Sequence, residues 1–233
     1  TGPGGSRSFS GEEVLYFGRS GDRFELRACA PEGEPHVLRS FPSLGFSAGP
    51  PAGRSDVSVH GGRVAWTELL GDSSALFIAE GRDGAPGRVA VVQGHLAGPV
   101  WSPDGRWIAA YYTPPGVNQP NAGFPRGVVF VVGVTTGGQP SAPPRLIDGG
   151  AMWPVGIAWL PDSRAVTVSG MGDQGNTTDI WLVSLREGDA PVNLTLDDPS
   201  TMWDYSLSPD GRYIAYAAEI QRGSSIWRID LPR

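Results

Sequence analysis

Short apolar stretches separated by turns rich in Gly and Pro recur along the whole chain. The segments 106–112 and 212–218 each follow such a turn and are apolar on almost every position. A strand with that pattern is buried on both faces, as it is when other sheets pack on each side. No segment keeps the 3.6-residue period of an amphipathic helix. The pattern therefore predicts an all-β fold built from many short strands.

The turns belong to an internal repeat. The sequence Ser-Pro-Asp-Gly-Arg occurs at 102–106 and 208–212, and Leu-Pro-Asp-Ser-Arg occurs at 160–164. Weaker copies begin at Phe9 and Val59. The equivalent turn positions are spaced by 50, 44, 58 and 48 residues, at Gly11, Gly61, Gly105, Ser163 and Gly211. Such a period fits one four-stranded blade of a β-propeller.

Each repeat combines a defined turn with a defined order of strands. In the turn, Pro presets φ, Asp can accept hydrogen bonds from backbone amides, and Gly tolerates a positive φ. A later strand of each unit carries an aromatic residue in register, which predicts an aromatic wedge between blades: Phe77, Phe130, Trp181 and Trp227. Short outer strands are expected at 36–38, 88–92, 145–147 and 192–195.

These features predict a single β-propeller domain over residues 1–233, with five blades, or six if a further segment is missing. The repeat units span approximately 8–48, 55–94, 96–149, 151–196 and 201–233. After the strand at 226–231 no residues remain for an outermost strand of the last unit. The last blade is therefore expected to be incomplete and to offer an open edge for strand addition.

The pattern at 208–216, Ser-Pro-Asp-Gly-Arg-x-Ile-Ala-Tyr, followed by Ile-Trp-x-x-Asp-Leu at 226–231, resembles the WD40-like PD40 repeat of TolB-like propellers. The resemblance covers essentially the whole chain and is strongest in the last three units. That family includes periplasmic propellers of envelope complexes, propellers attached to oligopeptidases, and propellers fused to sensor kinases. The resemblance implies the fold and a periplasmic or otherwise extracytoplasmic location, and it implies function only loosely.

Composition narrows the choice of partners. The chain carries a formal net charge of −6, and all of its basic residues are Arg. No clustered basic face is evident, so nucleic acid is not an expected partner. No apolar run approaches the ~20 residues that span a bilayer. The single cysteine, Cys29, excludes an internal disulfide.

Motifs for catalysis or cofactors fit poorly in their context. Residues 45–49 match the Gly-x-Ser-x-Gly nucleophile elbow, but two prolines follow where the motif needs a helix. Residues 170–175 match a dinucleotide fingerprint, but a strand follows them where the phosphate site needs a helix. A hairpin loop is therefore predicted. Asp173 and Asp179 could bind Ca²⁺ through oxygen ligands, although a solvated hairpin fits their spacing better. The three histidines lie in different units without metal-type spacing. We expect no catalytic residue, no metal and no cofactor.

Two groups of residues are candidate binding sites. Trp153 and Trp203, with Asp204 beside it, stand at equivalent places before an innermost strand, near the expected mouth of the central channel, where propellers bind ligands. The alternative is that the two tryptophans simply plug the channel. The long insert at 113–125 is rich in Pro, Asn and Gly and suits a docking loop, although an unpartnered solvated loop fits it equally. Its candidate contact residues are Pro114, Pro115, Asn118, Asn121 and Phe124.

The sequence therefore predicts a non-catalytic interaction or scaffold module, an accessory subunit docked to a larger, membrane-associated protein assembly. One alternative is the propeller of an oligopeptidase-like hydrolase whose catalytic domain lies outside this sequence. A second alternative is a five-bladed glycosidase that uses channel carboxylates such as Asp204, which would need to converge about 5–10 Å apart.

Overall fold

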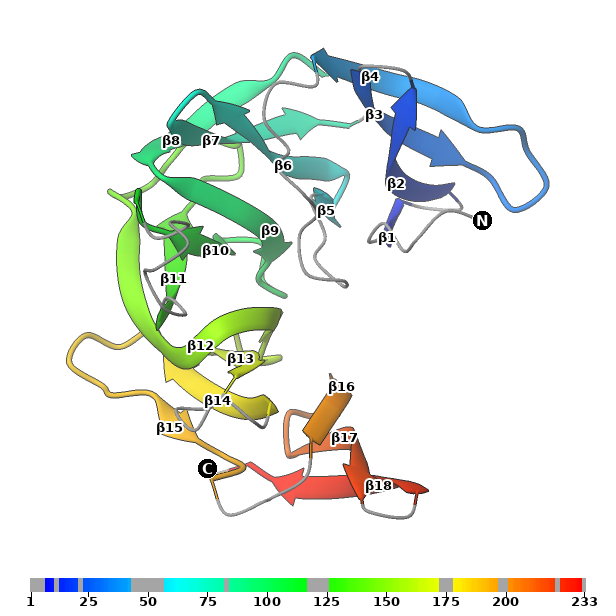
Figure 1. Ribbon diagram of the computed structural model, residues 1–233. Helices are drawn as coiled ribbons and strands as arrows, with labels where there is room; N and C mark the ends of the chain where they lie inside the picture. The colour runs from blue at the N-terminus through cyan, green and yellow to red at the C-terminus, as the bar shows by residue number, and fades with distance from the viewer. Residues whose placement is uncertain are drawn as a thin grey trace.

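The computed structural model describes residues 7–10, 13–20, 23–42, 57–81, 84–116, 126–171, 178–196, 201–220 and 223–231. These residues form eighteen β-strands and no helix. The strands build antiparallel sheets that follow one another around an arc, with the first and last sheets at its two ends (Figure 1). Strands β1, β5, β9 and β16 lie on the inner side of the arc. The predicted all-β propeller is confirmed.

Each unit runs from its inner strand outward. The first sheet contains β1 (Arg7–Ser10), β2 (Glu13–Ser20), β3 (Arg23–Cys29) and β4 (His36–Pro42). The second contains β5 (Val57–His60), β6 (Arg63–Leu70), β7 (Ser73–Glu80) and β8 (Gly87–Gln93). The third and fourth units share one continuous sheet of β9 (His95–Trp101), β10 (Trp107–Thr113), β11 (Arg126–Gly133), β12 (Arg145–Trp159), β13 (Ala165–Met171), β14 (Thr178–Ser184) and β15 (Val192–Asn193). The last sheet contains β16 (Thr201–Leu207), β17 (Tyr213–Ile220) and β18 (Gly223–Asp230).

Strand β12 belongs to two units at once. Its residues 145–152 pair with β11, and its residues 152–159 pair with β13. The chain bends between these halves at Gly149 and Gly150, and Gly150 has a φ of +74°. A Cβ atom on Gly150 would approach Cδ2 of Trp181 to 2.7 Å, so only glycine fits there. The outer strand predicted at 145–147 is confirmed, and it continues directly into the inner strand of the fourth unit.

The Ser-Pro-Asp-Gly turns have the predicted geometry. The glycine of the third-unit turn and that of the fifth-unit turn both have a φ of +67°. Ser102 Oγ donates a hydrogen bond to Asp104 Oδ1 (2.6 Å), and the same oxygen accepts the Arg106 amide (3.0 Å). The turn at 208–212 repeats both bonds. Side chains within the turn thus satisfy the amides that the turn leaves unpaired, which explains why the motif recurs.

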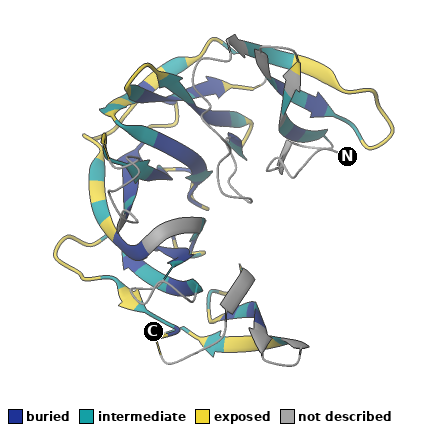
Figure 2. Ribbon diagram, viewed as in Figure 1, coloured by how far each residue is buried: buried dark blue, intermediate teal, exposed yellow. Residues whose placement is uncertain are grey.

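The third strand of each unit alternates between two neighbouring sheets. Phe77, Phe130 and Trp181 pack into the core shared with the preceding sheet, so the predicted aromatic wedge is confirmed for these units. The residue before each aromatic packs toward the following sheet and is at most 1% exposed: Leu76, Val129 and Ile180. The buried residues accordingly concentrate where adjacent sheets meet (Figure 2).

The last sheet has three strands in the described part of the chain, as the incomplete blade predicts. Its outer strand β18 carries the exposed residues Ile226 and Trp227, which are 84% and 48% exposed. Figure 2 shows this exposure along β18. Ile226 occupies the repeat position of Ile180, which is fully buried. The difference arises because no sheet in the described structure follows the last one.

Candidate functional site: the loop face of the propeller

The two faces of the arc, at opposite ends of the strands, carry different connections. We call the face with the turns at 102–106, 160–164 and 208–212 the turn face. The opposite face, the loop face, carries the starts of the inner strands at 93–95, 152–155 and 201–204, and the connections 113–126 and 171–178 leave from it. Strand pairing brings parts of the loop face together, because Met152 lies opposite both Arg126 and Met171. The segment 152–155 is therefore flanked by the ends of two loops.

The structure places the predicted channel-mouth residues within the inner strands and not before them. Trp153 lies in β12, and Trp203 and Asp204 lie in β16, because pairing with β13 and β17 continues to the loop face. The pairing of β12 shifts on both sides of Pro154, whereas that of β16 shifts once, around Trp203. Trp203 therefore matches Val155 in register and not Trp153, which corrects the predicted equivalence. The side chains of Trp153, Trp203 and Asp204 lie outside the described part of the structure.

The predicted docking loop emerges beside the start of β9. Tyr112, at the end of β10, donates its hydroxyl hydrogen bond to the Gln93 carbonyl (2.8 Å). Gly94 has a φ of +97°, and a Cβ atom there would lie 3.1 Å from the Pro115 nitrogen, so the base of the loop packs closely on the strand connection. Pro114 is half-buried and Pro115 is exposed. Three candidate residues of the loop lie outside the described residues: Asn118, Asn121 and Phe124.

The turn face is held by contacts between successive units. Arg63 Nη2 donates to the Gly105 carbonyl (2.8 Å), and its guanidinium stacks 4.4 Å from the centre of the Trp101 ring. The Asp104 amide donates to Ser163 Oγ (3.2 Å) in the next turn. The short turns are thus tied to one another.

The environment of Asp104, on the turn face, favours the charged form of its carboxylate. Burial opposes its charged form, but hydrogen bonds from Ser102, the Arg106 amide and Ser163 outweigh burial and hold the pKa of its carboxyl below its ordinary value. These partners are all parts of turns. The carboxylate therefore stabilises the turn face.

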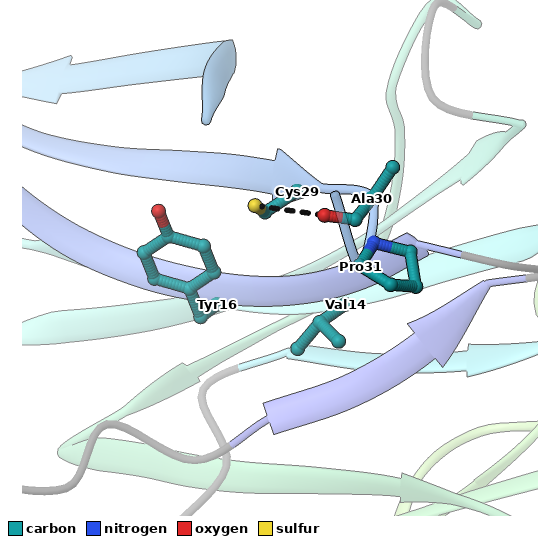
Figure 3. A pocket seen from close by; sticks show the side chains of 5 residues that line it. All are labelled: Val14, Tyr16, Cys29, Ala30 and Pro31. Atoms are coloured by element: carbon teal, nitrogen blue, oxygen red, sulfur yellow. Dashed lines mark hydrogen bonds between the residues drawn. The ribbon is translucent and has the colours of Figure 1, made fainter. Parts of the chain in front are cut away.

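A pocket of about 300 Å³ lies on the first sheet and is lined by Val14, Tyr16, Cys29, Ala30 and Pro31 (Figure 3). Cys29 Sγ lies 3.2 Å from the Ala30 carbonyl, to which it donates a weak hydrogen bond. Leu15, between Val14 and Tyr16, packs toward the second sheet. The pocket therefore lies on the opposite face of the first sheet, which points to the open end of the arc.

The repeat explains this pocket. Val14 pairs with Cys29 in the first sheet as Ile214 pairs with Ile229 in the last sheet. Ile214 and Ile229 belong to the core that Ile180 of the fourth sheet completes. The pocket is therefore the surface that a preceding sheet covers elsewhere in the arc. Sequence reasoning missed it, although aligning Val14 with Ile214 in the repeat could have indicated it.

The remaining candidates for chemistry are structural where the structure describes them. Asp179 is 7% exposed, and its carboxylate accepts hydrogen bonds from Asn193 Nδ2 (3.0 Å) and Thr195 Oγ1 (3.3 Å), which tie β14 to the following strand. Asp173, considered with Asp179 for Ca²⁺ binding, lies outside the described residues, as does the elbow motif at 45–49. The fingerprint at 170–175 leads from β13 into its antiparallel neighbour β14, so the predicted hairpin is confirmed. Among the described residues, no three His, Cys, Asp or Glu side chains gather in a way that could hold a metal.

No family model matches the chain, and no curated protein matches it in sequence. Among solved structures, TolB from Acinetobacter baumannii is similar with a TM-score of 0.62 and 14% identity, over 97% of this chain and 51% of that one. The putative TolB from Agrobacterium tumefaciens is similar with a TM-score of 0.62 and 16% identity, over 97% of this chain and 76% of that one. The chain has a TolB-like β-propeller fold.

A chain in a structure of the nidogen/laminin complex is also similar to this one, with a TM-score of 0.60 and 13% identity over 97% of this chain and 75% of that one. The chain spans about half the length of the first TolB and three quarters of the second. At these identities the likeness shows the fold alone. Within the described residues, no helix of the TolB-like propeller is long and apolar enough to cross a membrane.

Proposed function

We propose that this chain is a non-catalytic interaction module that binds a protein partner through its loop face. In this role it is an accessory subunit of a larger assembly outside the cytoplasm, associated with the membrane through that assembly. The observation that carries the proposal is strand pairing on the loop face: Met152, in the bulged segment 152–155, lies opposite both Arg126 and Met171, which are described ends of the 113–126 and 171–178 connections.

Three physical features support a binding role for this surface. Loops held by a rigid β scaffold are the usual carriers of recognition. The base of the 113–126 loop is fixed by the Tyr112–Gln93 hydrogen bond, so a partner would meet a loop with positioned ends. Bulges recur in the inner strands β12 and β16 at the loop face, and bulges redirect side chains away from the regular pleat. The resemblance to TolB-like propellers supports the extracytoplasmic location.

Capture from native cells tests the proposal. The tagged chain is expressed in the organism that makes it, mildly crosslinked, and recovered with its partners for quantitative mass spectrometry. One loop-face variant combines Trp153→Ala with Trp203→Ala. A second replaces the candidate docking-loop residues by alanine: Pro114, Pro115, Asn118, Asn121 and Phe124.

The matched control combines Arg106→Ala with Arg164→Ala, two exposed positions on the turn face. We expect at least one loop-face variant to lose the proteins that the wild type and the control retain. Unchanged recovery with both loop-face variants, at equal folded content by circular dichroism, would overturn the assignment of the loop face. Fractionation of the same cells tests the location, and recovery with the cytosol contradicts it.

A further inference from the structure

Strand β18 presents a long, regular edge. It pairs with β17 over its whole length without a register shift, from Tyr213 opposite Asp230 to Ile220 opposite Gly223. In the described part of the chain, no strand pairs with its other side. In every other unit the corresponding third strand is covered by a fourth, supplied by β4, β8, β12 or β15.

One hydrogen bond just beyond the end of β18 shows to which side the backbone groups of each of its residues point. The Leu231 amide donates to the Arg212 carbonyl (2.7 Å), so it points toward β17. Direction alternates along an antiparallel strand, and the backbone groups of four residues therefore point outward: Ser224, Ile226, Arg228 and Asp230. In the fourth unit, Ile180 holds the position of Ile226, and there the Leu194 amide and Thr195 Oγ1 satisfy its carbonyl and amide.

The outer strands β4, β8 and β15 are protected against pairing with another chain, whereas β18 is not. Strand β15 has two residues, and the outer pairings of β4 and β8 are each interrupted by a register shift. Short strands and bulges of this kind prevent edge-to-edge association. Strand β18 has eight residues, no proline and no bulge, and its Ile226 is 84% exposed.

We propose that β18 pairs antiparallel with β18 of a second copy of this chain, about a two-fold axis at Trp227. In this register Ile226 of one copy lies opposite Arg228 of the other, and Ser224 lies opposite Asp230. The outward amides and carbonyls of all four residues then find partners. One self-complementary contact completes both last sheets, as two-fold symmetry requires.

The axis at Trp227 is selected by charge and by length. An axis at Arg228 would place Arg opposite Arg, which is unfavourable. An axis at Ile229 would leave Ile226 without a partner in β18, because the strand ends at Asp230. With the axis at Trp227 no like charges stand opposite each other. Arg228 and Asp230 also neutralise each other within the strand (3.5 Å), so the edges meet without net repulsion although the chain carries −6.

The side chains also favour a second copy as the occupant. The axis brings Trp227 against its symmetry mate in a non-hydrogen-bonded pair, where side chains approach most closely and aromatic pairs are most stabilising. Trp227 is 48% exposed, so that contact removes apolar area from water on both copies. This surface is the outer edge of the last sheet and does not include the loop face, so the inference stands apart from the proposed function.

Sedimentation equilibrium of the purified 233-residue chain over a wide concentration range tests the pairing. We expect a monomer–dimer equilibrium. Ile226→Pro removes an outward amide and leaves the bonds to β17 in place, because proline is tolerated on an edge strand when its nitrogen faces outward. It should weaken the dimer at least about tenfold, since each copy loses one intermolecular hydrogen bond.

The matched control is Leu146→Pro. Leu146 lies opposite Phe130 in the part of β12 that forms an edge, is 53% exposed, and by the same alternation turns its amide outward. This variant should dimerise like the wild type. A wild-type chain that stays monomeric at every concentration, or a dimer that Ile226→Pro leaves intact, would overturn the proposal.

A cysteine scan tests the register independently of proline. In a Cys29→Ser background, Trp227→Cys places two thiols across the two-fold axis, close enough for a disulfide after mild oxidation. Ile229→Cys, two residues from the axis, should not crosslink. Covalent dimers through Trp227→Cys alone support the pairing, whereas crosslinking through Ile229→Cys alone refutes the register.

Discussion

The bend in β12 makes a quantitative prediction at Gly150. Replacing this residue by alanine adds one methyl group in a left-handed conformation, with φ at +74°. That backbone strain costs about 1–2 kcal/mol for a residue with a Cβ atom. The methyl group would also overlap the Trp181 ring, approaching Cδ2 to 2.7 Å. Such overpacking adds about 1–3 kcal/mol, so Gly150→Ala should lower the free energy of unfolding by about 2–5 kcal/mol in total.

Gly71→Ala is the matched control. Gly71 has a φ of +66°, close to that of Gly150, but no atom lies within 4 Å of the position its Cβ would take. It should therefore cost only the backbone term of about 1–2 kcal/mol. Urea unfolding followed by tryptophan fluorescence measures both losses. Each kcal/mol should also lower Tm by about 2–4 °C in a chain of this size.

A second substitution separates the overlap from the strain. Trp181→Leu removes the ring that the new methyl group meets, so in that background Gly150→Ala should cost about as much as Gly71→Ala does in the wild type. The difference between the backgrounds is the coupling energy of the two positions. Equal losses for Gly150→Ala and Gly71→Ala in the wild type would refute the claim that packing on Trp181 requires a glycine at the bend.

Three further predictions concern contacts within and between units. Because hydrogen bonds hold the pKa of Asp104 below its ordinary value, its stabilisation is present above the unfolded pKa and is lost as pH falls through the folded one. The difference in unfolding free energy between wild type and Asp104→Asn should therefore shrink in acid, and a growing difference would contradict this. A double-mutant cycle of Thr167→Val and Tyr205→Phe should give a coupling of about 0.5–1.5 kcal/mol, because these hydroxyls from adjacent units lie 3.0 Å apart; zero coupling would refute the bond. Trp159→Phe should lower the free energy of unfolding by about 1–3 kcal/mol, because it leaves the Val100 carbonyl without the indole donor at 3.0 Å; no change in urea unfolding would contradict that role.

The candidate site could be predicted only in part. The sequence singled out Trp153, Trp203 and the 113–125 loop because tryptophans and long Pro- and Asn-rich inserts stand out from a repeat. It could not show that Met152 lies opposite both Arg126 and Met171, since that depends on strand pairing and Arg126 lies more than twenty residues before Met152. It also misaligned the two tryptophans, because bulges change the register and leave no clear signal in the residues around Trp203.

The turn motif and the fold class were determined by the sequence alone. The bonds of the Ser-Pro-Asp-Gly turn join Ser102, Asp104 and Arg106, residues so close in the chain that their identity suffices to form them. The repeated aromatic position could be aligned between units from the sequence as well. Side chains alternate strictly between the two faces of a strand, so residues at the same place in the repeat face the same way.

Burial, by contrast, was decided only by the tertiary structure. The dipeptide Ile-Trp occurs at 180–181 and at 226–227, in the same strand of two units and in the same register. Ile180 is fully buried and Ile226 is 84% exposed. The dipeptide itself does not distinguish them, because burial depends on whether a following sheet is present to cover the residue. The pocket at Val14 and the exposed face of β18 at Ile226 both lack a neighbouring sheet in the described structure, at the two ends of the arc.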